Sequence, residues 1–193
     1  MSNITTKREK FYELPSLTVN SAHLQKIWDE GQDKKGRGEK NDFYSKALEW
    51  VNSLGITGKN YKNQDKEWEI QFTRKSADNV LQHHAGIQKA AMLEIVPKLI
   101  ENGIYLESIP KNDKGLITHV FACKAKIDGN EYAVSFAVRE DNNGRRYYDH
   151  NFIETKALDR FSQAPDERVS RISDHTKGGT PESLNEMLIR HLQ

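Results

Sequence analysis

Histidines, arginines and tyrosines are the residues of this chain whose types and spacing could support catalysis. Metal-independent cleavage of RNA needs a base for the ribose 2′-hydroxyl, an acid for the leaving 5′-oxygen, and cations for the charge on the phosphorane. Histidine can act as acid or base near neutral pH, arginine offers a bidentate fork to phosphate, and tyrosine can stack on a base or donate to phosphate. The candidate catalytic residues are therefore His83, His84, Arg139, Tyr148 and His150.

The same residues also have structural interpretations. A histidine pair at a helix end commonly caps terminal carbonyls, arginines near a turn are often solvated, and adjacent tyrosines pack across strands. His119 alternates with apolar residues, so it is expected to be a satisfied interior or edge histidine. No two histidines are three or four residues apart, so a three-histidine metal site is the less favoured alternative, and neither a metal nor another cofactor is predicted.

The composition narrows the classes of protein to which the chain can belong. With 193 residues and a mean hydropathy of -0.82, we expect one domain with long polar segments. The net charge of +1 means that any nucleic-acid binding must use a local patch. The single cysteine, Cys123, excludes an internal disulfide and a zinc finger. The sequence also lacks the P-loop, GxGxxG, HExxH and GxSxG motifs, which leaves nucleotide-hydrolysing, dinucleotide-dependent, zincin and α/β-hydrolase functions without support.

A β-hairpin is the strongest structural signal. The alternating stretches ITHVFACKAKI and EYAVSFAVR flank Asp128 and Gly129, a pair that favours a two-residue turn. This turn places Phe121 opposite Phe136 and gives the ribbon one apolar face, which must pack against helices. Lys124, with its neighbours on alternate positions, then belongs to the opposite, open face.

A third strand is predicted in RRYYDHNFIE, after a turn at Asn143 and Gly144. A two-residue turn there would place Tyr148 opposite Arg139 on the open face. A loop longer by one residue would reverse the faces of this strand. Lys124, Lys126 and Arg146 are the candidate RNA-binding residues of the open face.

Helical patterns lie on both sides of these strands. We expect helices over Ser21 to Glu30 and Asp42 to Leu54, a short helix capped by Ser76, a helix that is kinked or restarted at Pro97, and a terminal helix in TPESLNEMLIRHLQ. The fold class is α+β, with N-terminal helices packed on a small antiparallel sheet and polar helical extensions at both ends. The predicted division is an extension over residues 1–67, a core over 68–156 and a polar tail over 157–193.

The segment IQFTRKSADNVLQHH, followed by HVFACKAKIDGNEYAVSFAVRE and RRYYDHNFIE, resembles the third class of large polyvalent protein-associated domain. That class occurs in phage and mobile-element proteins and is placed in the barnase, EndoU, colicin and RelE superfamily of RNases. The resemblance covers about residues 68–156. It implies a histidine near the end of the early helix, at His83 or His84, a basic strand residue at Arg139, and a last-strand segment at Tyr148, Asp149 and His150.

The resemblance and the residue types together predict an endoribonuclease that acts without a metal as a toxin or effector of a phage or mobile element. Its expected partners are RNA (tRNA or mRNA) and a cognate inhibitor or target protein. An alternative is a non-catalytic binding or inhibitory module, such as an immunity or anti-defence protein, that uses the same open face. No apolar stretch is long enough for a membrane span or a secretion signal, so we expect no membrane partner and a cytoplasmic location, either in the producing cell or in a cell into which the protein is delivered.

Overall fold

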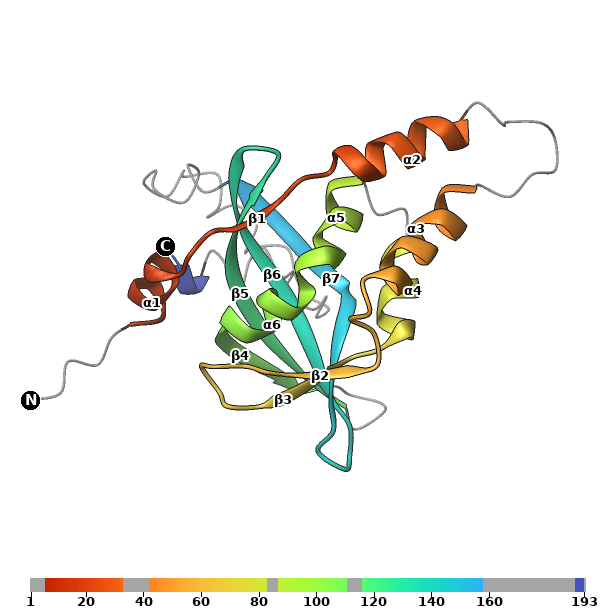
Figure 1. Cartoon of the computed structure of the whole chain (residues 1–193). Coiled ribbons are helices and arrows are strands. Elements are labelled where there is room, and N and C mark those ends of the chain that lie inside the picture. Colours follow the sequence, from red (N-terminus) through yellow and green to blue (C-terminus); the bar gives the residue numbers. More distant parts are fainter. Residues whose placement is uncertain (1–5, 33–41, 83–86, 111–115, 158–189, 193) are drawn as a thin grey trace, which may run out of the picture.

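The chain folds into helices packed on a curled β-sheet (Figure 1). The computed structural model describes residues 6–32, 42–82, 87–110, 116–157 and 190–192. The elements in chain order are α1 (Lys7–Glu13), β1 (Leu17–Val19), α2 (Ala22–Gln32), α3 (Asp42–Ser53), β2 (Lys59–Lys62), β3 (Glu69–Phe72), α4 (Arg74–Gln82), α5 (Ile87–Ala91), the 3₁₀ helix η1 (Met92–Ile95), α6 (Val96–Asn102), β4 (Ile104–Pro110), β5 (Ile117–Ile127), β6 (Asn130–Glu140) and β7 (Arg146–Ala157). The predicted α+β class is therefore correct.

The hairpin of β5 and β6 has the predicted register. Phe121 pairs with Phe136 and Ile127 pairs with Asn130, so Asp128 and Gly129 form the two-residue turn. Both turn residues have positive φ, 49° and 89°, the backbone conformation that a type I′ turn requires. Asp128 also accepts hydrogen bonds from the backbone and the hydroxyl of Ser21, at 2.8 and 2.7 Å, which ties the turn to the segment before α2.

The sheet is mixed rather than antiparallel, which corrects one detail of the prediction. Its strand order is β1-β5-β6-β7-β3-β2, with β4 paired to the other part of β5. β1 runs parallel to β5, and β3 pairs in parallel with β7 through Gln71 and Tyr147. Local periodicity identifies a strand but carries no information about its direction relative to a distant partner, so these two parallel pairs were missed.

The helices α2 to α6 cover one face of the sheet and enclose the main core. The predicted helices in the first third are present as α2 and α3, and they bury Leu24, Phe43 and Val51. The helix around Pro97 is restarted rather than merely kinked, because η1 separates α5 from α6. Gly103 ends α6 where a Cβ would lie 2.6 Å from the Phe136 ring, so this position excludes any larger residue without a shift.

The opposite face of the sheet is largely covered, contrary to the prediction of an open face. Val120, Ala122 and Ala133 are fully buried there with Phe11 of α1 and Leu192. α1 and the C-terminal end lie side by side over this face (Figure 1). Small and apolar residues at alternate positions of β5 and β6 therefore form a second core. Two ends of this face lie outside it, one near Thr118 and Arg139 and the other near Lys124 and Lys126. Leu192, in the predicted terminal helix, is buried. The part of that predicted helix up to residue 189 lies outside the described residues.

β7 follows a loop that is one residue longer than the predicted turn. Asp141 and Arg145 pair through their backbones at 3.0 Å, and Gly144 has a φ of 75°, so Asn142, Asn143 and Gly144 form a three-residue loop. Arg139 consequently lies opposite Tyr147, not Tyr148. The predicted placement of Tyr148 and Arg146 on the face of Arg139 is wrong for this reason, and Tyr147 and Asp149 take that place instead.

α4 begins earlier than predicted. The Thr73 hydroxyl accepts a hydrogen bond from the Ser76 backbone N–H at 3.0 Å, so Thr73 caps the helix. Ser76, which was predicted to be the cap, lies inside the helix and donates its hydroxyl proton to the Tyr148 carbonyl at 2.6 Å. This contact fixes the first turn of α4 against β7.

No helix in the described part of the chain is long and apolar enough to cross a membrane.

Candidate functional site

A pocket of about 650 Å³ lies where the first turn of α4 meets β6 and β7. Its volume is in the range of pockets that bind small ligands or single nucleotides. The residues that line it are Thr73, Lys75, Ser76, Asn79, Leu116, Arg139, Asp141, Tyr147, Tyr148 and Asp149. The pocket thus joins the early helix and the strand arginine that the sequence singled out.

An ion pair between Arg139 and Asp149 lies in this pocket. The Arg139 Nε contacts the Asp149 Oδ2, and the two side chains are 25% and 8% exposed. Lys75 adds a second cation and Asp141 a second carboxylate, so the lining is balanced in charge. A balanced set of this kind can hold a phosphate through the cations while a carboxylate accepts a proton nearby.

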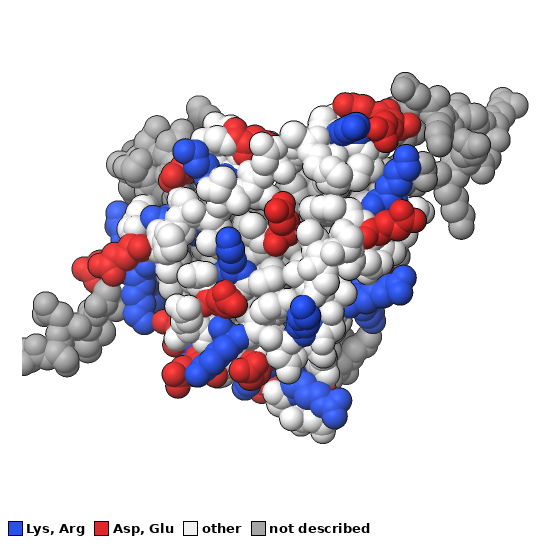
Figure 2. Space-filling model, in the orientation of Figure 1, with Lys and Arg blue, Asp and Glu red and all other residues white. Residues whose placement is uncertain are grey.

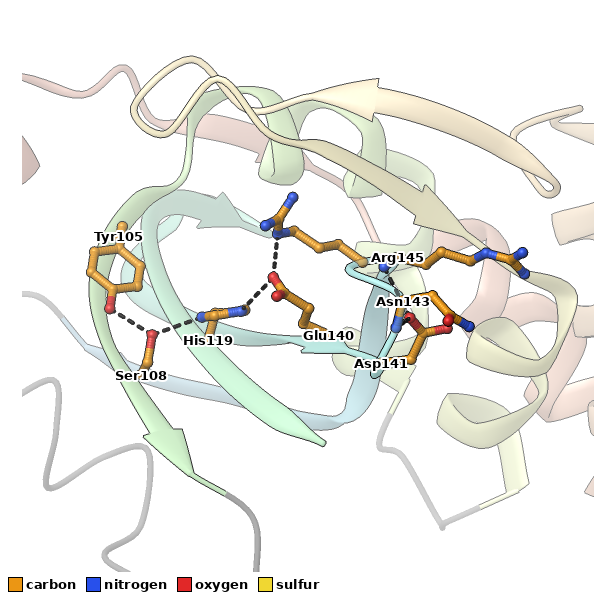
Figure 3. Close-up of polar contacts among 8 residues, drawn as sticks. Tyr105, Ser108, His119, Glu140, Asp141, Asn143 and Arg145 are labelled. Atoms are coloured by element: carbon orange, nitrogen blue, oxygen red, sulfur yellow. Dashed lines mark hydrogen bonds and ion pairs between the residues drawn. The ribbon is translucent and has the colours of Figure 1, made fainter. Parts of the chain in front are cut away.

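Asp141 organises the loop at the edge of the pocket. Its Oδ1 accepts hydrogen bonds from the backbone N–H groups of Asn143, at 2.9 Å, and Arg145, at 3.0 Å (Figure 3). These bonds hold the pKa of the Asp141 carboxyl below its ordinary value, and the bond from Arg145 has the largest effect. Tyr147, which lines the pocket beside it, donates to the other carboxylate oxygen at 3.4 Å. The loop is therefore built around a charged Asp141 rather than leaving this carboxylate available as a base.

Among the predicted catalytic residues, the structure describes the side chains of Arg139 and Tyr148, and both residues line the pocket. Tyr148 contributes its backbone to the α4 contact, however, and the residue is only 1% exposed. Burial raises the pKa of the Tyr148 hydroxyl well above its ordinary value, which does not favour a role in proton transfer. His150 belongs to β7, but its side chain, like the whole of His83 and His84, lies outside the described residues.

The predicted RNA-binding lysines are remote from this pocket. Lys124 pairs with Ala133, so it is about 20 Å along the strand from Arg139 at roughly 3.3 Å per residue. Its ammonium donates to the Tyr12 carbonyl of α1 at 2.8 Å, and Lys126 is exposed still nearer the hairpin turn. Lys and Arg are interspersed with Asp and Glu on the face shown in Figure 2. Lys124 and Lys126 therefore do not line the pocket that contains Arg139.

Arg146 instead joins a group of polar residues on the helix-covered face of the sheet. Its Nε is 2.6 Å from the Glu140 Oε2, and its guanidinium lies over the Trp68 ring at 4.2 Å. Glu140 also contacts the His119 Nε2 at 3.2 Å, and the His119 Nδ1 is 2.7 Å from the Ser108 Oγ (Figure 3). We call Ser108, His119, Glu140 and Arg146 the His119 chain. His119 is 5% exposed, so the expectation of a satisfied interior histidine is confirmed.

Sequence reasoning missed Glu140, which carried a usable signal. The correct hairpin register places His119 opposite Val138, which makes Glu140 its diagonal neighbour on the same face. Asp149 lies in the last-strand segment that the resemblance named, but the predicted loop was one residue too short and placed it off the face of Arg139. Ser108 could not be paired with His119, because the register of β4 includes a bulge between Tyr105 and Glu107.

The buried position of His119 makes the stability of the protein depend on pH. Burial lowers the pKa of His119 below its ordinary 6.5, an effect that hydrogen bonding to Glu140 only partly offsets. The folded protein therefore favours the neutral imidazole, whereas the unfolded chain takes up a proton once the pH falls below about 6.5. We expect the free energy contributed by His119 to be fully present above that pH and to be lost as the pH falls towards the lowered pKa.

Urea denaturation between pH 7.5 and 5 tests this expectation. The unfolding free energy of the His119→Gln protein should fall less over this interval than that of the unmodified protein, and the exposed His23→Gln should behave as the unmodified protein does. Equal slopes for all three proteins would contradict the assignment.

Cys123 takes no part in either polar group. It is 1% exposed, burial raises the pKa of its thiol, and the thiol contacts the Leu99 carbonyl. Cys123 therefore packs in the apolar face of the hairpin, within the main core. Within the described ranges, no three His, Cys, Asp or Glu side chains are grouped as metal ligands would be.

Comparison with known proteins gives one family. The sequence model of the large polyvalent protein-associated domain 3 matches residues 38–148, which begins before the resemblance over residues 68–156 and ends within β7. No curated protein and no solved structure gives a significant match. The matched region runs from before α3 to Tyr148 and so includes α4, Arg139 and every described residue of the pocket lining except Asp149. Because the match spans more than half of the 193 residues, the chain belongs to the large polyvalent protein-associated domain 3 family.

Proposed function

We propose that the protein is a metal-independent ribonuclease that uses the pocket between α4 and β7. The observation that carries this proposal is the Arg139 and Asp149 pair, a guanidinium and a carboxylate in contact within a cavity of nucleotide size. The placement of the third class of large polyvalent protein-associated domain in the barnase, EndoU, colicin and RelE superfamily of RNases, which the sequence resemblance implies, suggests the same chemistry. The substrate would be RNA, either tRNA or mRNA.

The roles follow from the chemistry of each group. Asp149 takes the proton of the ribose 2′-hydroxyl, and the 2′-oxygen attacks the adjacent phosphorus. Arg139 and Lys75 hold the phosphate oxygens as negative charge develops on the phosphorane. A histidine, from His83, His84 or His150, protonates the 5′-oxygen as it leaves, so the products are a 2′,3′-cyclic phosphate and a free 5′-hydroxyl.

Tyr147 takes the role that the sequence suggested for Tyr148. Its half-buried ring lines the pocket beside Arg139, and Asp141 holds its hydroxyl. An aromatic ring at this position offers a stacking surface for a base next to the scissile phosphate.

In biological terms, we propose a toxin or effector of a phage or mobile element that acts on cytoplasmic RNA, with an inhibitor protein as its natural partner.

Incubation of the purified protein with total RNA and tRNA in excess EDTA tests the proposal. We expect discrete cleavage and 2′,3′-cyclic phosphate ends, since no step needs a metal ion. Intact RNA over a wide range of protein concentration, together with normal growth of cells that express the protein, would contradict it. A heat-denatured sample of the same preparation controls for contaminating RNases, which commonly survive or refold after heating.

A non-catalytic binding module is the second candidate, and the charge balance of the pocket favours it. Arg139 already has Asp149 as its counterion, which reduces its attraction for phosphate relative to an unpaired arginine. An immunity or anti-defence protein could use the same pocket to hold a polar group of a partner. Capture of a stoichiometric partner through the pocket, abolished by Tyr147→Ala, together with intact RNA in EDTA, would establish this alternative.

A further inference from the structure

The His119 chain has the order of groups found in nucleophilic catalysis. Tyr105 Oη is 2.6 Å from Ser108 Oγ, which is 2.7 Å from His119 Nδ1, and His119 Nε2 is 3.2 Å from Glu140 Oε2 (Figure 3). Hydroxyl, imidazole and carboxylate therefore follow one another within hydrogen-bond distance. An activated nucleophile is recognised by this geometry and not by sequence position.

The direction of each hydrogen bond follows from the acceptor at one end. A carboxylate only accepts, so Glu140 requires the proton of the neutral imidazole to be on Nε2. Nδ1 then carries a lone pair and accepts the hydroxyl proton of Ser108. The Ser108 oxygen in turn accepts from Tyr105. His119 is consequently oriented as a base towards Ser108, with its other nitrogen fixed by Glu140.

The surroundings keep the imidazole fixed while the serine is accessible. Ser108 is exposed, whereas the His119 side chain is 6% exposed and lies 4.7 Å, between ring centroids, from Trp68. Arg146 contacts Glu140 and stacks on the same Trp68 ring, which holds the carboxylate in place. The lowered pKa of His119 keeps its Nδ1 free to take a proton near neutral pH.

We propose that Ser108, His119 and Glu140 form a second reactive site, in which Ser108 accepts an acyl group from a carboxylic ester. Ser108 Oγ attacks the ester carbonyl carbon, and its proton passes to His119 Nδ1. The alcohol leaves with that proton, and water then attacks the acyl-serine to release the acid and regenerate the hydroxyl. The Tyr105 hydroxyl is within hydrogen-bond distance of the serine oxygen, so it is placed to donate to the oxyanion.

This site is separate from the proposed ribonuclease pocket. Arg139 and Glu140 are adjacent in β6, so their side chains lie on opposite faces of the sheet. The acyl-transfer proposal therefore does not rest on RNA cleavage, and neither result decides the other.

The test uses p-nitrophenyl acetate with the full-length protein. We expect a burst of p-nitrophenol and an acetyl group on Ser108, identified by peptide mass spectrometry. Ser108→Ala should abolish the burst, and His119→Gln should slow acetylation on the order of a hundredfold, the usual contribution of a general base. Ser16 is the control within the same molecule, because it is a half-buried serine hydrogen-bonded to a carboxylate, Glu131, at 3.3 Å, with no imidazole in that contact.

A pH profile separates this role from a purely structural one. The rate of Ser108 acetylation should be level at neutral pH and fall in acid with the pKa of His119, below 6.5. Glu140→Gln provides the second variant if His119→Gln fails to fold, and it should slow acetylation as well. Acetylation of Ser108 at the rate of Ser16, or a rate that neither variant changes, would overturn the proposal.

Discussion

Replacement of Arg139 with alanine is expected to lower RNA cleavage on the order of a hundredfold, the usual size of the effect when one charge-stabilising group is removed. The proposed role requires the guanidinium to hold phosphate oxygens in the pocket, where it lies beside Asp149. Arg139→Lys should restore only part of the rate, because an ammonium keeps the charge but not the bidentate geometry. Initial rates on a defined RNA substrate in EDTA measure both effects.

Removal of Arg139 is also expected to lower the stability of the protein, because the residue forms an ion pair that the sequence did not predict. On the predicted open face, a solvated Arg139 could be removed with little effect on thermal stability. In the structure, its removal takes the cation away from Asp149, which is 7% exposed, so the free energy of unfolding should also fall. Cleavage must therefore be compared at a temperature where both proteins are folded, as judged by circular dichroism.

Arg145→Ala is the matched control for the arginine variants. This arginine is exposed in the same loop region, and its hydrogen bond to Asp141 is donated by its backbone N–H, so truncation of its side chain should leave both rate and stability nearly unchanged. If Arg139→Ala and Arg145→Ala cleave RNA equally well while the unmodified protein is active, the ribonuclease site does not lie in this pocket.

Replacement of Phe136 with alanine is expected to lower the free energy of unfolding by about 3 to 5 kcal/mol. The side chain is fully buried, with its ring stacked on Phe121 at 5.3 Å and tilted against Tyr148 at 5.2 Å. Gly103 also lies directly against this ring, so α6, β5 and β7 all pack on it. A loss of this size is a large part of the roughly 5 to 15 kcal/mol that stabilises an ordinary domain.

Urea or guanidinium denaturation measures the effect of this cavity. Ile117→Ala is the control, because Ile117 is in the neighbouring strand but 38% exposed, and it should change the unfolding free energy by no more than about 0.5 kcal/mol. A loss below about 1 kcal/mol for Phe136→Ala would mean that the ring does not occupy the centre of the core.

The hairpin could be predicted to the residue because its signal is local. Asp128 and Gly129 define a turn in which both residues have positive φ, and the pairing of Phe121 with Phe136 follows by counting outward. The same counting predicted the wrong length for the next turn, because Asn143 and Gly144 suit a two-residue turn as well as the three-residue loop that is present. One residue of error reversed the faces of β7 and exchanged Tyr148 for Tyr147 and Asp149 in the site.

Other features depended on partners that are distant in the sequence. The second core was not recognised because Phe11 and Leu192, near opposite ends of the chain, are needed to show that Val120 and Ala122 are covered. The His119 chain likewise depends on β4, whose bulge shifts Ser108 into line with His119. Residue types identified the groups that could react, but the assembly of those groups depends on the tertiary fold.

The parallel pairing of β1 with β5 has a consequence for how the protein folds as it is synthesised. Leu17 to Val19 leave the ribosome long before their partners, Ala125 to Ile127. β3 likewise cannot pair with Tyr147 of β7 until that strand has been translated. β1 therefore remains unpaired until β5 has been translated, and β3 has only β2 as a partner until β7 has been translated. Contacts of such long sequence separation slow folding. We expect nascent chains that end before β5 to be sensitive to proteases, and protection to appear only after β7 has emerged.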